Sequence, residues 1–113
     1  MATDERLERG TLKLEMPLTL DDDRVLDELK YDFGNVTGTL LLSVLGSSEA
    51  GAFSTRHALN LFLCACAPEE NGGLTRDEIR TRLTAGDILG AQMLGAGFFR
   101  ARSASALTRI VAR

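Results

Sequence analysis

His57 and Cys64 are the two side chains whose types could support nucleophilic chemistry, with the thiol as nucleophile and the imidazole as base. They lie seven residues apart in a stretch with helical apolar spacing. Two helical turns separate such positions by about 10 Å, which is beyond hydrogen-bonding reach. We therefore interpret His57 as a histidine at the polar edge of a helix and Cys64 as a small buried residue, and we predict no catalytic pair.

The patterns for metal and phosphate sites are also incomplete. Cys64 and Cys66 are two positions apart, so a helix would point them about 200° apart and they could not hold one ion together. The three aspartates of residues 21–23 lack the spacing of a calcium loop and indicate a solvated turn. The glycines of residues 90–97 lie in an apolar run without the Lys-Ser/Thr that follows a phosphate loop. The sequence thus predicts a protein that is not an enzyme and that has no metal and no cofactor.

The length and charge of the chain limit its class. Its 113 residues suffice for one domain with a single core. The 13 basic and 16 acidic residues give a net charge of −3, which argues against binding nucleic acid by bulk charge. No run approaches the roughly 20 apolar residues of a membrane span, and the charged first residues are unlike a signal peptide. With two cysteines, too few for a disulfide framework, these features predict a small soluble cytoplasmic domain.

An N-terminal β-hairpin is predicted over residues 11–31, after a charged arm of residues 1–10 that we expect to be mobile. Apolar and polar residues alternate over the first ten hairpin positions, and Pro17 falls on the polar side, as in an edge strand or a strand break. Residues 24–31 form the returning strand. One face of that strand carries Val25, Leu29 and Tyr31. A two-stranded hairpin is marginal alone, so it must pack on helices or on another subunit's sheet.

The remainder, residues 36–113, is predicted to be helical and to complete a single small domain over residues 11–113. Residues 40–46 fit either a short helix ended by glycine or a buried strand, and we favour the helix. After a linker over residues 46–51, a helix capped by Ser54 or Thr55 runs to about Ala67, just before a proline.

Two further helix starts follow within a few residues of one another. Thr75 and Glu78 form a capping box, and Thr84 with Asp87 repeats the arrangement nine residues later. The predicted fold class is therefore α+β, an N-terminal β-hairpin packed with three to five mostly C-terminal α-helices.

The last of these helices carries the most informative stretch. From Ile88 to Phe99 the only polar side chain is Gln92, and a helix that is apolar all round must be covered all round. A chain of this size has little protein with which to surround a central helix. We predict an assembly surface there, made by Leu89, Met93, Leu94, Phe98 and Phe99. The alternative is a central core helix whose glycines and alanines allow close helix packing.

The C-terminal end is basic, with Arg100, Arg102, Arg109 and Arg113 and no acidic residue between them. This pattern fits either a phosphate-binding segment or a solvated helix whose charges complement its dipole, which we favour.

A winged-helix-like DNA-binding protein is a further alternative, with Arg76, Arg80 and Arg82 facing a major groove. Against it, the supposed recognition helix offers only Gln92 for base edges.

The order of elements resembles phage tail assembly chaperones. Residues 11–20 (TLKLEMPLTL), an acidic turn and residues 24–31 (RVLDELKY) are similar to the opening of that family, a strand with an L-x-x-P pattern followed by a V-x-E-L-like strand. Residues 83–88 (LTAGDI) and the helix to Phe98-Phe99 are similar to its terminal helix. Residues 34–38 and the glycine-serine linker depart from the family pattern.

The resemblance implies a non-enzymatic assembly factor in the cytoplasm of an infected bacterium. Such a protein binds the tape-measure protein, keeps it soluble until the tail tube polymerises, and has the tail-tube protein as a second partner. It is expected to be a homo-oligomer. Replacing Leu94 and Phe98 by Asp should abolish association with the client or with a second copy while leaving the chain folded. A secretion chaperone or an immunity protein remains an alternative, because each needs an acidic body and an apolar docking face.

Overall fold

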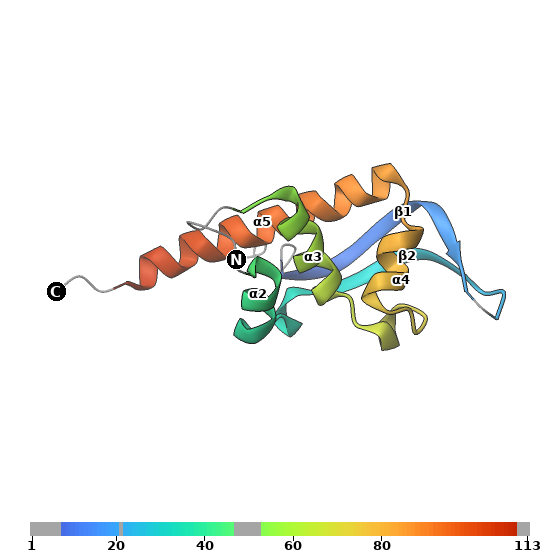
Figure 1. The fold of residues 1–113 in the computed structure, drawn as a ribbon, viewed down its shortest axis with the longest axis horizontal. Coiled ribbons are helices and arrows are strands. Elements are labelled where there is room, and N and C mark those ends of the chain that lie inside the picture. Colours follow the sequence, from blue (N-terminus) through green and yellow to red (C-terminus); the bar gives the residue numbers. More distant parts are fainter. Residues whose placement is uncertain (1–7, 21, 47–52, 111–113) are drawn as a thin grey trace.

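The computed structural model describes residues 8–20, 22–46 and 53–110 and has an α+β fold (Figure 1). Among these residues an antiparallel hairpin is followed by four α-helices and two short 3₁₀ helices, in agreement with the predicted fold class. In chain order the elements are β1 (Arg9–Thr19), β2 (Val25–Asp32), η1 (Phe33–Asn35), α2 (Gly38–Leu45), α3 (Thr55–Ala65), η3 (Pro68–Glu70), α4 (Arg76–Arg82) and α5 (Ala85–Arg109).

The hairpin is interrupted where Pro17 falls. Regular pairing runs from Arg9↔Asp32 to Lys13↔Glu28 and resumes at Leu18↔Leu26, so four residues of β1 lie opposite one residue of β2. A proline has no N–H to donate to the ladder, and a bulge is a place where strands tolerate it.

The hairpin buries one face, although less of it than the alternation predicts. Leu29 and Tyr31 of β2 are buried as expected, whereas Val25 is exposed. Beyond the irregularity near Pro17, Val25 pairs with the exposed Thr19, while the neighbouring Leu18 is buried, so the side chain of Val25 lies on the solvent face of the hairpin (the hairpin is seen in Figure 1).

Strand β1 starts earlier than predicted, because Arg9 and Gly10 pair with β2. The expected mobile arm of residues 1–10 is therefore wrong for these two residues, and its first seven residues lie outside the described part of the chain.

The helix favoured for residues 40–46 is confirmed as α2. The Thr37 side chain accepts the Leu40 N–H at its start, and Gly46 ends it with a φ of +59°, a conformation that suits glycine. The predicted linker after it lies largely outside the described residues.

Helix α3 is the centre of the core. Six of its side chains are buried: Ala58, Leu59, Leu61, Phe62, Leu63 and Ala65. It contacts α5, α2, α4, η1 and β2, so little of its surface remains for solvent. It ends at Ala65 rather than Ala67, because a residue before a proline is disfavoured in helical geometry.

Asn71, fully buried, ties the helices to the open edge of β2. Its Oδ1 accepts the N–H of Lys30 at 2.8 Å, and its Nδ2 donates to the Lys30 carbonyl at 3.0 Å and to the Ala67 carbonyl at 2.9 Å. The amide side chain thus pairs with the strand as a neighbouring strand would.

Asp87 makes the corresponding tie to β1. Its carboxylate accepts the Glu15 N–H at 2.8 Å and the Thr84 hydroxyl at 3.1 Å. The predicted capping box at Thr84 is therefore wrong in its second half, because the carboxylate bonds a bulged strand residue rather than the backbone of Thr84. The box at Thr75 and Glu78 is confirmed.

Candidate partner-binding surface

The predicted chemistry-bearing residues of α3 have separate structural roles. His57 lies at the start of the helix, where its Nδ1 accepts the Ser54 N–H at 3.0 Å and completes a capping box. Cys64 lies at the other end of α3 in a polar cleft that His57 does not line.

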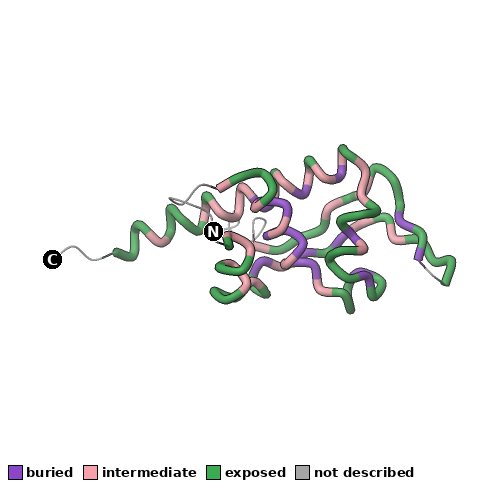
Figure 2. Tube along the Cα trace, viewed as in Figure 1, coloured by how far each residue is buried: buried purple, intermediate pink, exposed green. Residues whose placement is uncertain are grey.

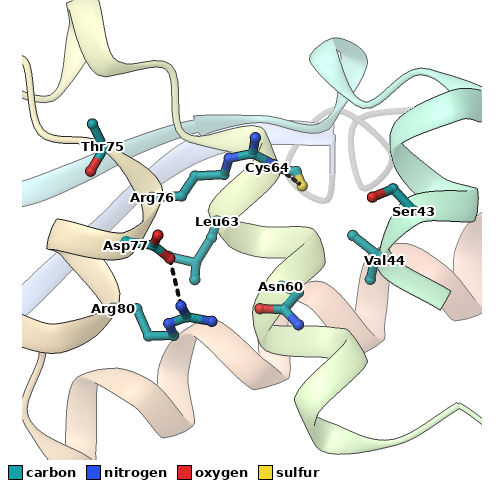
Figure 3. A pocket seen from close by; sticks show the side chains of 9 residues that line it. All are labelled: Ser43, Val44, Asn60, Leu63, Cys64, Thr75, Arg76, Asp77 and Arg80. Atoms are coloured by element: carbon teal, nitrogen blue, oxygen red, sulfur yellow. Dashed lines mark hydrogen bonds and ion pairs between the residues drawn. The ribbon is translucent and has the colours of Figure 1, made fainter. Parts of the chain in front are cut away.

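That cleft, of about 380 Å³, lies between α3, α4 and the end of α2 (Figure 3). The Arg76 guanidinium donates to the Cys64 Sγ at 2.9 Å, and Arg80 bonds Asp77 at 2.5 Å. Both arginines that line it thus have partners in the cleft wall, Arg76 the thiol and Arg80 the carboxylate.

The two thiols should differ sharply in reactivity. Cys66 is 2% exposed, and burial together with the neighbouring Cys64 raises the pKa of its thiol to about 12. At pH 8 roughly one Cys66 thiol in ten thousand is then ionised, and the thiolate is the nucleophile. We expect iodoacetamide to label the half-buried Cys64 in the folded protein and Cys66 only after unfolding, as read by peptide mass spectrometry. Equal labelling of both in the native state would contradict this placement, and Cys64→Ser should remove the native-state signal.

Helix α5 packs one face on the core and leaves the opposite face in solvent. Ala91 and Gly95 are buried against α3, and a Cβ built on Gly95 would overlap the carbonyl group of Ala58. On the other side, Leu89 is 60% exposed and Met93 is 75% exposed. The helix is therefore not enclosed by its own chain.

The five residues of the predicted assembly surface divide between these faces. Leu89 and Met93 point to solvent, while Leu94 packs against the core. Phe98 stacks on Phe33 with ring centroids 4.2 Å apart.

Phe99 likewise stacks on Phe53 at 3.9 Å. The variant with Asp at Leu94 and Phe98 would therefore disturb the fold, so a test of association has to use Leu89 and Met93.

Leu107 extends the exposed face and was not among the predicted residues. It follows Leu89 by eighteen positions, which is five full helical turns, and it is 70% exposed. Counting the helical phase from Leu89 would have found it. Arg100, also exposed, lies between Met93 and Leu107 on this side of the helix. We name Leu89, Met93, Arg100 and Leu107 the outer face of α5.

The C-terminal part of α5 projects beyond the rest of the molecule (Figure 1), and exposed residues dominate it (Figure 2). The helix has 25 residues and is about 37 Å long. A helical end with so few contacts gains stability when a partner packs against it.

The arginines of the DNA-binding alternative have intramolecular partners. Arg82 donates to the Thr19 carbonyl at 2.9 Å and lies 4.0 Å from Glu78, while Arg80 pairs with Asp77 and Arg76 with Cys64.

Within the described residues, no group of three His, Cys, Asp or Glu side chains is placed to hold a metal ion. No helix in this part of the chain is long and apolar enough to cross a bilayer. Comparison with family models, with curated proteins and with solved structures finds no match to this chain.

Proposed function

We propose that this chain is a non-enzymatic tail assembly chaperone that binds apolar helical segments of a phage tape-measure protein in the host bacterial cytoplasm. The outer face of α5 is the observation that carries the proposal, because a client helix laid along it would cover Leu89, Met93 and Leu107 together. The order of sequence elements, which resembles that family, supports the same assignment.

The strength of such binding suits a chaperone that must release its client. Covering side chains that are 60–75% exposed gains about 1–2 kcal/mol each in the hydrophobic term. Three of them, offset by the entropy of association, give a reversible complex unless many copies act along one client. Self-association and contact with the tail-tube protein belong to the same proposal, since tube subunits must replace the chaperone on the client.

The proposal is tested by co-expression with the tape-measure protein encoded in the same genome. We expect the native chain to keep that protein in the soluble fraction and Leu89→Asp with Met93→Asp to lose most of this effect, because two carboxylates on the outer face would be desolvated on binding. Since both side chains are exposed, the variant should keep the thermal unfolding midpoint of the native chain.

Leu42→Asp is the matched control, because Leu42 is a 69% exposed leucine on another helix, α2. Equal loss of solubilisation in this control, or full solubilisation by the α5 double variant, would refute the assignment of the outer face.

A further inference from the structure

A second cleft of about 400 Å³ lies on the inner side of α5, where the helix leaves the body. Its opposite wall is formed by η1 and the start of α2. Apolar side chains make its floor and two arginines lie at its edge; the lining includes Phe33, Leu41, Phe98, Phe99, Arg102 and Arg109. We name it the apolar-basic cleft.

The cleft continues the core-facing side of α5 past the end of the core. Phe98, Arg102, Ala106 and Arg109 follow one another at helical spacing on that side. Phe98 is the last of them to be covered by an aromatic stack, with Phe33. Arg102 lies over the Phe98 ring, 5.6 Å from its centroid. Beyond Phe98, the side chains on the inner side of α5 line the open cleft and are not packed against the core.

The charge of the cleft selects for carboxylates. Arg102 pairs with the carboxylate of Glu8, which comes from the far end of the chain. Arg109 makes no ion pair with any described residue. From Ile88 to Ile110 the helix contains three arginines and no acidic residue, so nothing on α5 itself neutralises the cleft.

We infer that the apolar-basic cleft binds an acidic amphipathic helix of the client, an inference that rests on the proposed function and names the chemistry of the client segment. The apolar side of that helix covers the half-buried Leu41 and Phe99, and its carboxylates meet Arg102 and Arg109. The two arginines are seven positions apart, two helical turns or about 10 Å, so acidic residues two turns apart on the client reach both. When no client is bound, Glu8 forms an ion pair with Arg102, so Glu8 competes with the carboxylates of the client for this arginine.

The test uses the full chain and a synthetic helical peptide of about 20 residues, long enough to be helical by itself, with a leucine stripe flanked by glutamates. A matched peptide carries lysines in place of the glutamates. By fluorescence anisotropy at low salt we expect the glutamate peptide to bind clearly more tightly than the lysine peptide. Arg109→Glu should weaken binding about fivefold, and added salt should weaken it further.

Glu8→Gln is the decisive variant, because it frees Arg102 and should tighten binding about twofold to threefold, a gain that damage to the fold would not produce. Equal binding of both peptides, or no effect of either variant, would overturn the inference. A dimer of the chain that Arg109→Glu dissociates would also overturn it, since a second copy would then occupy the cleft.

Failure here is separable from failure of the proposed function. A chain that solubilises the tape-measure protein through the outer face but binds neither peptide overturns the cleft assignment alone. The Leu89→Asp and Met93→Asp double variant should keep the preference for the glutamate peptide, because neither residue lines the cleft.

Discussion

Gly95→Ala is expected to lower the free energy of unfolding by about 2–4 kcal/mol, although alanine is favoured over glycine in a helix interior by about 1 kcal/mol. A Cβ at this position would overlap the carbonyl oxygen of Ala58 and stand 2.7 Å from its carbonyl carbon. The obstacle is backbone of a buried helix, so no side-chain rotation relieves it. Helix α5 has to move away from α3, which also loosens the stack of Phe98 on Phe33.

Urea unfolding followed by circular dichroism measures this effect, with Gly90→Ala as the control in the same helix. At Gly90 a Cβ would meet only the end of the flexible Leu12 side chain, at 3.3 Å, so we expect a change within about 1 kcal/mol. If the two variants are equally stable, α5 does not approach α3 at Gly95 as described.

Asn71→Ala is expected to lower the free energy of unfolding by about 2–4 kcal/mol. The change removes three hydrogen bonds at once and leaves a void where a fully buried amide was packed. The β2 edge at Lys30 loses its partner, and the loop before α4 loses its bond to the Ala67 carbonyl. Amide exchange at Lys30 should accelerate together with the loss of global stability.

Asn60→Ala is the control, because it removes the same side-chain amide from a position where that amide bonds neither a strand nor a loop. Asn60 is half-buried on α3 and its side chain makes no hydrogen bond within the described residues, so we expect a change below about 0.5 kcal/mol. A cost for Asn71→Ala as small as that of Asn60→Ala would mean that the hairpin is held to the helices by apolar contact alone.

Gly95 and Asn71 both stabilise the packing of the core, and neither lies on the outer face of α5. Because α5 is fixed to α3 at Gly95, its helical phase is set, and Leu89 and Met93 are turned to solvent. Stability and the candidate partner-binding surface thus depend on opposite sides of one helix.

Signals that act over three or four residues were readable from the sequence. The α+β class and the capping box at Thr75 followed from alternation, apolar runs and cap residues, and the apolar run at residues 40–46 before a glycine favoured a helix over a strand. Each depends on neighbours along the chain, and a local hydrogen bond forms whatever the rest of the molecule does. The break near Pro17 belongs to the same class, because the missing N–H is a property of the residue itself.

Which way each apolar side chain points depended on the tertiary structure. The run from Ile88 to Phe99 is apolar on every side, so its composition does not show which side of the helix faces the core. The contact of Gly95 with α3 decides this, and it places Phe98 in the interior and Met93 in solvent. The bonds of Asn71 to Lys30 and of Asp87 to Glu15 join residues 41 and 72 positions apart. No local pattern marks a polar side chain that will find its partner at such a separation, because the partner is a backbone group that every residue offers.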